Sequence, residues 1–211
     1  MFLPLVDVLR CPVAHEETWL VASIDRAEDR DIITGALGCP QCLAEYPIRD
    51  GIVHFAADVP LPEYRAPDEA GAMRLAAALD LTDARMTAVL HGGWASHAPL
   101  IRGFSPAQLL LVNAPAGVAT GDGISLVRAL SAPLASASVN AAAFDADASE
   151  EMIRSLIVSL RPNGRLLGPA SVPVPAGLSE LARDDEVWVA QAGAATTSAP
   201  ISLSRRGSSR A

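Results

Sequence analysis

Short apolar runs alternate with stretches of helical spacing over most of the chain. Between residues 69 and 83, apolar side chains recur every three or four positions, which predicts an amphipathic helix. A second helix is predicted at 150–160, with Ser149 as its N-cap and two acidic residues in its first turn. Compact apolar runs predict strands at 86–93, 107–115, 136–147 and 163–171, and a short strand or turn at 124–130.

The remaining pattern completes an α/β layout. Short helices are predicted at 96–104 and 176–184, and a closing antiparallel hairpin is predicted from 186–193 and 200–206. Strands and helices that alternate with short connections favour a mostly parallel sheet, to which the hairpin would add an antiparallel strand at one end.

The first 57 residues follow a different pattern. Apolar alternation in YPIRDGIVHF predicts two short strands joined by a tight turn at Asp50-Gly51. Directly before it, Cys39 and Cys42 form a C-x2-C pair, which supplies two of the four ligands that tetrahedral zinc requires. The candidate second pair is Cys11 and His15.

These residues resemble the small zinc-ribbon family that activates tRNA, rRNA and protein methyltransferases, together with its short bacterial relatives. In that family an L-x-C-P-x-C knuckle precedes C-x-x-C-x-x-x-Y-P-I-x-D-G-I, and the second knuckle matches from Cys39 to Ile52. The first knuckle departs from the pattern, because Ala14 stands where the family has its second cysteine. Either His15 replaces that cysteine in a structural Cys3His zinc site, or the site is degenerate and holds no metal.

The second part of the chain resembles class I S-adenosylmethionine-dependent methyltransferases. Its landmark is SLRPNGRLL at 159–167, which is similar to the turn leading into the fifth strand of that family. The stretch 132–145 is similar to the passage into the fourth strand. The resemblance implies a Rossmann-like fold over residues 70–206, with a cofactor site at the ends of the first two parallel strands.

The expected cofactor positions depart from the family. Gly92 and Gly93 remain as a loop, but His91 stands near the acidic position, and Trp94 places a large side chain where a small one would admit the ligand. The second strand ends at Asn113 rather than at an acid, which weakens its hydrogen bond to a ribose hydroxyl. Binding of S-adenosylmethionine is therefore expected to be lost, and only if it persists would Gly92, Gly93 and Asn113 be its ligands.

Other polar residues carry weaker signals. His91 and His97 have no acidic partner nearby in sequence, so a metal pair or a general base is disfavoured. Asp145 and Asp147 follow the fourth predicted strand, where they would either face a substrate or cap the next helix.

Charge and composition limit the classes of function that the protein could have. Residues 1–69 hold 13 acidic residues and 5 arginines, so the whole formal net charge of −8 belongs to them, which disfavours direct nucleic-acid binding. No apolar run approaches the length of a membrane span, and three cysteines without a leader pattern predict a reducing, cytoplasmic location.

The sequence predicts a zinc-ribbon-like module at 1–57, a proline-rich linker at 58–69, a methyltransferase-like α/β domain at 70–206 and a disordered tail at 207–211. We expect the ribbon to dock on its own second domain. The predicted function is a non-catalytic interaction or structural subunit with a protein partner, because the losses fall on cofactor contacts while the landmarks of the fold persist. The alternative is an active S-adenosylmethionine-dependent methyltransferase of unknown substrate, since methyl transfer can proceed largely by proximity.

Overall fold

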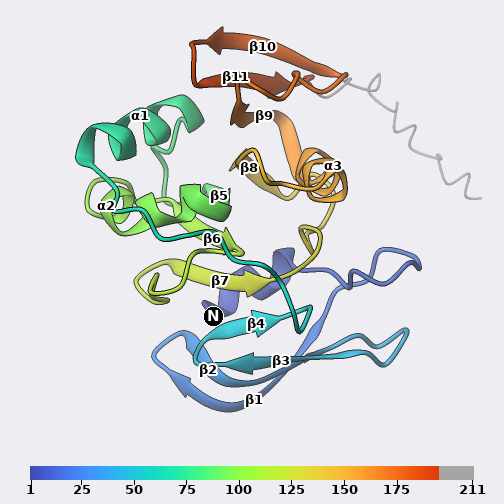
Figure 1. The fold of residues 1–211 in the computed structure, drawn as a ribbon. Coiled ribbons are helices and arrows are strands. Elements are labelled where there is room, and N and C mark those ends of the chain that lie inside the picture. Colours follow the sequence, from blue (N-terminus) through green and yellow to red (C-terminus); the bar gives the residue numbers. More distant parts are fainter. Residues whose placement is uncertain (195–211) are drawn as a thin grey trace, which may run out of the picture.

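The computed structural model describes residues 1–194 of the chain and contains one mixed sheet with helices on both faces (Figure 1). The order of strands across the sheet is β1-β2-β3-β4-β7-β6-β5-β8-β9-β11-β10. The elements are η1 (Leu3–Val8), β1 (Val21–Glu28), β2 (Asp31–Gly38), β3 (Glu45–Arg49), β4 (Ile52–His54), α1 (Glu69–Leu79), β5 (Thr87–His91), η2 (Gly92–His97), α2 (Ala98–Arg102), β6 (Gln108–Val112), β7 (Ile124–Arg128), β8 (Val139–Ala143), α3 (Glu150–Ser159), β9 (Leu160–Pro169), β10 (Leu178–Arg183) and β11 (Val187–Ala192).

The central strands β7, β6, β5, β8 and β9 run parallel. Their order places the first strand, β5, in the middle of the sheet and the next two on one side, which is the doubly wound Rossmann arrangement. At the far end β11 pairs antiparallel with β9, and β10 pairs antiparallel with β11. The predicted α/β fold, a Rossmann-like sheet with a C-terminal antiparallel hairpin, is confirmed.

One element predicted beside that hairpin was wrong. Residues 176–184 were expected to be helical, but β10 occupies 178–183 and pairs with β11. The i, i+3 spacing of Leu178 and Leu181 imitates a helix, yet pairing with an existing strand outweighs so weak a local preference. The expected partner strand at 200–206 and the predicted tail at 207–211 lie outside the described residues.

A helix cap and a tight turn form as the sequence predicts. The Ser149 hydroxyl accepts the Met152 N–H at 3.1 Å and caps α3. Asp50 and Gly51 both have positive φ, 50° and 75°, and turn the chain between β3 and β4 as a two-residue hairpin loop requires.

Strands β1 to β4 form an antiparallel meander that is continuous with the parallel sheet. Val53 of β4 pairs in parallel register with Val127 of β7, and the backbone N–H groups of Phe55 and Ala56 both reach the Arg128 carbonyl. One buried cluster includes ribbon side chains together with side chains of β6, β7 and α3. The division into domains at 58–69 stays a prediction, but neither the sheet nor the core is interrupted there.

The two faces of the parallel strands carry separate cores. Successive residues of β5 alternate between them, so that Val89 packs on the face of α3 and the ribbon, and Leu90 on the face of α1 and α2. Because both faces are covered, the strands are almost wholly apolar, as the sequence pattern indicated. Their carboxyl ends all open at one edge of the sheet, where polar residues become available for binding.

Candidate functional site

Two places bring polar side chains together: a cysteine–histidine cluster in the ribbon and a crevice at the carboxyl ends of the parallel strands. In the cluster, Cys11 follows η1, His15 lies on the next loop, and Cys39 and Cys42 flank the turn after β2. One ligand atom of each residue lies within 4.8 Å of all the others. The four residues that the sequence singled out are therefore assembled around one point.

The spacing within this cluster fits a tetrahedral ion. Zinc bonds of about 2.3 Å to sulfur and about 2.0 Å to nitrogen would place two sulfurs about 3.8 Å apart, and a sulfur and a nitrogen about 3.6 Å apart. The Sγ atoms of Cys11 and Cys42 lie 3.6 Å apart, and Cys39 Sγ lies 3.5 Å from His15 Nε2. Four converging donors at these separations could hold one metal ion in a closed site.

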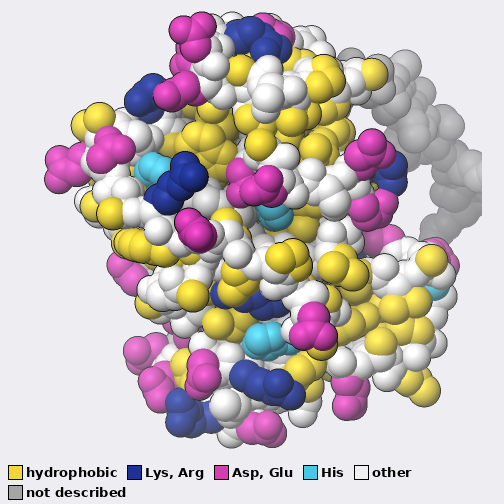
Figure 2. Space-filling view, in the orientation of Figure 1, with side chains coloured by type: hydrophobic (Ala, Val, Ile, Leu, Met, Phe, Trp, Pro, Cys, Tyr) yellow, Lys and Arg dark blue, Asp and Glu magenta, His cyan; other side chains and the backbone are white. Residues whose placement is uncertain are grey.

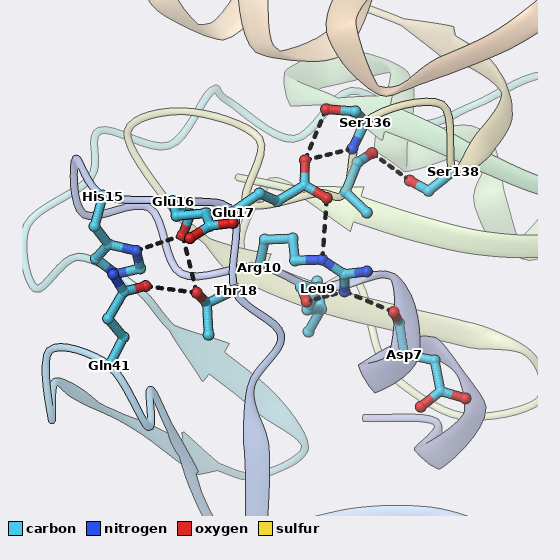
Figure 3. A network of polar contacts seen from close by, with 11 residues as sticks. Asp7, Leu9, Arg10, His15, Glu16, Glu17, Thr18, Gln41, Ser136 and Ser138 are labelled. Carbon is cyan, nitrogen blue, oxygen red and sulfur yellow. Dashed lines mark hydrogen bonds and ion pairs between the residues drawn. The ribbon is translucent and has the colours of Figure 1, made fainter.

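Neighbouring groups prepare two of the donors for metal binding. His15 Nδ1 donates to the Glu16 carbonyl at 2.6 Å (Figure 3). This bond leaves Nε2 for the cysteines, and Nε2 lies 3.5 Å from Cys39 Sγ. Desolvation opposes the ionisation of Cys39, but the backbone N–H groups of Cys42 and Gln41 outweigh it and lower the pKa of the thiol to about 6. Cys39 can therefore supply a thiolate at neutral pH.

The loop that carries His15 is tied to the parallel domain by an ion pair and hydrogen bonds. Glu17 accepts the Ser136 N–H at 3.0 Å and the Ser136 hydroxyl at 2.7 Å, and its other oxygen lies 3.4 Å from Arg10 Nε (Figure 3). Chiefly through the Ser136 hydroxyl, these contacts hold the pKa of Glu17 below its ordinary value. The cluster is thus fixed relative to the rest of the sheet.

The second place is a cavity of about 340 Å³ at the ends of β5, β6 and β8. Its walls include His91 and Gly92 after β5, Asn113 after β6, and Asp145 after β8. Of the residues that the sequence proposed for a cofactor, Gly92 and Asn113 therefore lie at this cavity, and Gly93 is adjacent to it. This is where ligands bind in doubly wound sheets.

The carboxylate of Asp145 lies directly over the glycine loop. Asp145 Oδ2 accepts the Gly93 N–H at 2.8 Å, and a Cβ atom built on Gly92 would fall 1.9 Å from the same oxygen. Gly92 has φ +65°, so both its backbone conformation and its surroundings require glycine. An internal anion therefore uses the N–H group that an anionic ligand would otherwise bind.

His91 and Asp145 face each other within this crevice. His91 Nδ1 lies 3.2 Å from Asp145 Oδ1, although the angles are not those of a hydrogen bond, and both atoms are buried without a hydrogen-bond partner among the described residues. Burial would raise the pKa of Asp145, but His91 and the Gly93 N–H outweigh it and hold that pKa below its ordinary value. Asp145 is therefore a carboxylate at neutral pH.

The side chain of Asn113 is bonded to the backbone. Its Nδ2 donates to the Ala129 carbonyl at 2.8 Å, and its Oδ1 accepts the Ala129 N–H at 3.0 Å. The residue is buried and has φ +55°, a conformation that asparagine tolerates better than most residues. Asn113 therefore acts as a clamp between the ends of β6 and β7.

Trp94 lies elsewhere than the sequence implied. Its Nε1 donates to the Phe144 carbonyl at 3.0 Å, and its ring lines a neighbouring cavity of about 660 Å³ rather than the one at the strand ends. The space over the glycine loop is occupied by Asp145 instead. Sequence reasoning did not place Asp145 there, because it lies 54 residues beyond His91 and joins it only when β5 and β8 pair.

The segment that connects β4 to α1 covers both cavities. We call residues 57–67 the strap: residues 59–62 line the first cavity and residues from 62 onward line the second. Figure 1 shows this segment crossing in front of the parallel strands on its way to α1. The segment that the sequence predicted as a linker therefore contributes walls to the crevice.

Comparison with known proteins gives structural likeness only. No family model matches the sequence. No curated protein matches it either. Among solved structures, TrmN from Thermus thermophilus is 14% identical over 61% of this chain and 50% of its own, with a TM-score of 0.46. A putative methyltransferase, yhhF from Escherichia coli, is 17% identical over 66% of this chain and 93% of its own, with a TM-score of 0.43.

A SAM-dependent O-methyltransferase from Thermotoga maritima is 10% identical over 68% of this chain and 69% of its own, with a TM-score of 0.42. The chain spans only 43% to 51% of the length of the [4+2]-cyclase SpnF, the Thermus protein and two further methyltransferases that it matches. Separately, none of the helices in residues 1–194 is both long and apolar enough to cross a membrane.

Proposed function

We propose that this protein is a non-catalytic interaction or structural subunit, in which a zinc-stapled ribbon is joined to a methyltransferase-like domain whose cofactor site is eroded. The proposal rests on the internal hydrogen bonds of the crevice at the strand ends. The Asn113 amide makes two hydrogen bonds to the Ala129 backbone, and the Gly93 N–H is already bonded to Asp145. A nucleoside cofactor that used these same groups would have to displace internal hydrogen bonds, each worth about 1 kcal/mol and more where charge is involved.

Zinc is the proposed occupant of the cysteine–histidine cluster. Three thiol ligands and one imidazole are the donors of structural zinc sites, and the sulfur–sulfur and sulfur–nitrogen separations support tetrahedral coordination. With four protein ligands the ion would have no open position for substrate. Its role would be to hold the loop of Cys11 and His15 against the turn after β2.

The ribbon is proposed to cover the sheet edge of its own chain. The parallel pairing of Ile52–His54 with Leu126–Arg128 and the shared buried cluster support this intramolecular docking. Without the ribbon, β7 would present an unpaired edge to solvent, and such edges favour aggregation. This arrangement makes the ribbon a permanent part of the domain that it covers.

A protein partner is proposed to bind the outer side of the ribbon. Trp19 is 68% exposed and Leu43 is 81% exposed, and Val21 lies with Leu43 along one shallow hollow beside the cysteine turn. Figure 2 shows apolar side chains gathered over the ribbon loops at the lower right. Exposed aromatic and aliphatic side chains that lie close together are typical of interaction surfaces.

An active S-adenosylmethionine-dependent methyltransferase is the alternative. It is favoured by the cavity of about 340 Å³ at the strand ends, since that volume lies within the range of small-molecule sites. Titration with S-adenosylmethionine discriminates between the two. We expect no binding at tens of micromolar, and a low micromolar dissociation constant would make the enzyme the better account.

A further inference from the structure

The hydroxyl of Tyr46 lies against one of the four donors of the cysteine–histidine cluster. Tyr46 Oη is 3.1 Å from Cys11 Sγ, which is within hydrogen-bond distance for a sulfur partner. Both side chains are buried, with 7% of Tyr46 and 9% of Cys11 exposed. Among residues 1–194, Cys11 is the one hydrogen-bond partner of this hydroxyl. The contact is therefore the way in which the buried hydroxyl is satisfied within the described part of the chain.

The direction of this hydrogen bond follows from the chemistry of a metal ligand. A cysteine that ligates zinc has lost its proton, so its sulfur can only accept a hydrogen bond. A neutral tyrosine hydroxyl keeps its proton and can donate it. With the proposed zinc ion bound, Tyr46 is the donor and the Cys11 thiolate is the acceptor. Hydrogen bonds to a charged acceptor are shorter and stronger than those between neutral groups.

Tyr46 reaches its acceptor from a different element of the fold. The thiol of Cys39 is bonded by the backbone N–H groups of Cys42 and Gln41, which belong to its own turn. Cys11, in contrast, follows η1, and its side-chain donor comes from β3, 35 residues further along the chain. The bond from Tyr46 thus ties the segment of Cys11 to the sheet independently of the metal.

The sheet holds the tyrosine ring in place. Tyr46 pairs with Leu37 of β2, and the alternation along β3 turns its side chain into the buried cluster. Its ring packs on Phe55 with the ring centroids 4.7 Å apart, and the Phe55 N–H donates to the Arg128 carbonyl of β7. The hydroxyl is therefore positioned by the strands around it.

We propose that Tyr46 is a positioning residue of the zinc site, whose hydroxyl holds the Cys11 thiolate toward the ion and stabilises its negative charge. The inference rests on the zinc ion proposed above and extends it, because it assigns part of the metal affinity to a residue outside the four ligands. Loss of a hydrogen bond to a metal ligand typically lowers metal affinity about 10- to 100-fold. It also makes the thiolate a stronger electron donor to the metal.

The test compares wild type with Tyr46→Phe in the full chain. This variant removes the hydroxyl and keeps the ring that packs on Phe55. The affinity for Zn²⁺ is measured by competition with a chelator, and the protein loaded with Co²⁺ is measured by absorption. We expect Tyr46→Phe to bind one equivalent of metal, with an affinity for zinc at least about fivefold lower. Its sulfur-to-cobalt charge-transfer band should lie at longer wavelength than that of the wild type.

Two control variants separate the hydroxyl from the packing around it. Tyr64→Phe makes the same chemical change at a tyrosine that is 55% exposed and outside the cluster, so it should alter neither the affinity nor the band. Phe55→Leu loosens the packing of the Tyr46 ring but keeps the hydroxyl, so the band should stay at its wild-type wavelength. A shift in Phe55→Leu as large as that in Tyr46→Phe would contradict a role for the hydroxyl.

The outcomes distinguish this inference from the zinc proposal on which it rests. A wild-type protein that binds neither Zn²⁺ nor Co²⁺ would overturn both. A wild type that binds one equivalent, together with a Tyr46→Phe variant of equal affinity and unchanged absorption, would overturn the role of Tyr46 alone.

Discussion

The carboxylate of Asp145 fills the space in which a side chain on Gly92 would lie. The built Cβ of Gly92 falls 1.9 Å from Asp145 Oδ2 and 2.6 Å from its Cγ, while the neighbouring Gly93 N–H donates to that oxygen at 2.8 Å. The strand-end loop is thus packed around an internal carboxylate.

Gly92→Ala should destabilise the protein through this contact. The positive φ alone costs about 1 kcal/mol, and displacement of Asp145 should add at least about 1 kcal/mol by breaking its bond to Gly93. Urea denaturation would measure the loss. Gly177→Ala is the control, because Gly177 has φ +88° but no atom within 4 Å of its built Cβ. Equal losses in the two variants would contradict a role for Asp145.

Removal of a ligand from the cysteine–histidine cluster should release the metal. Wild-type protein prepared without an affinity tag should hold about one equivalent of zinc, Cys39→Ser far less, and His15→Ala should bind zinc at least about tenfold more weakly. Elemental analysis and chelator titration would measure this. His54→Gln changes a histidine outside the cluster and should retain zinc. A folded ribbon with well below one equivalent of metal would contradict the zinc proposal.

The contact of Glu17 with Ser136 should make stability depend on pH. Because the pKa of Glu17 is lower in the folded state than its ordinary 4.5, the carboxylate stabilises the fold fully above that value and loses this effect as the pH falls through the folded pKa. Glu17→Gln should therefore be slightly less stable than wild type at pH 7, and the difference should shrink as the pH falls below 4.5 through the folded pKa. The contribution is small because the side chain is 46% exposed.

Glu16→Gln is the matched control for this pH dependence. Glu16 contributes its backbone carbonyl to the His15 and Thr18 hydrogen bonds, which the substitution leaves in place. Urea denaturation of the three proteins across pH 3–7 compares them directly. A Glu16→Gln variant that lost as much stability as Glu17→Gln would show that the effect is one of general charge.

Cleavage of the strap should leave the ribbon attached. A site-specific protease sequence in place of residues 61–66 would cut a segment that makes no hydrogen bonds to other described residues, whereas the β4–β7 pairing and the shared core stay intact. The two fragments should then co-elute on a sizing column until denaturant is added. Clean separation under native conditions would contradict docking of the ribbon on its own chain.

The sequence predicted those parts of the fold whose signal is local. The apolar runs of β5 and β6, the Ser149 cap and the Asp50-Gly51 turn each lie within a few residues and form as expected. The hairpin of β1 and β2 gave no such signal. Most residues of β1 are exposed, so buried and exposed positions do not alternate along the strand. For the same reason β10, whose residues are nearly all exposed, was mistaken for a helix.

Three positions of the cysteine–histidine cluster, Cys11, Cys39 and Cys42, were predictable because they match a family pattern, and His15 was proposed from its spacing to Cys11 although the family has a cysteine at the position of Ala14. The crevice was predictable only in outline, since its central contacts join residues from different strands. Asn113 was expected to face a ligand, but its engagement by Ala129 depends on how β6 and β7 end side by side. The strap was read as a spacer because proline-rich composition says nothing about which surface a segment crosses.

The most direct test of the central claim is calorimetric titration of the wild-type protein with S-adenosylmethionine, together with Asn113→Asp and the exposed control Asn163→Asp. Because the Gly93 N–H and the Asn113 side chain are bonded within the protein, we predict no binding heat at tens of micromolar for any of the three proteins. Asn113→Asp should also lose about 1–3 kcal/mol of stability, since a carboxylate cannot donate to the Ala129 carbonyl. A low micromolar dissociation constant for the wild type would contradict the eroded site and establish a working cofactor pocket.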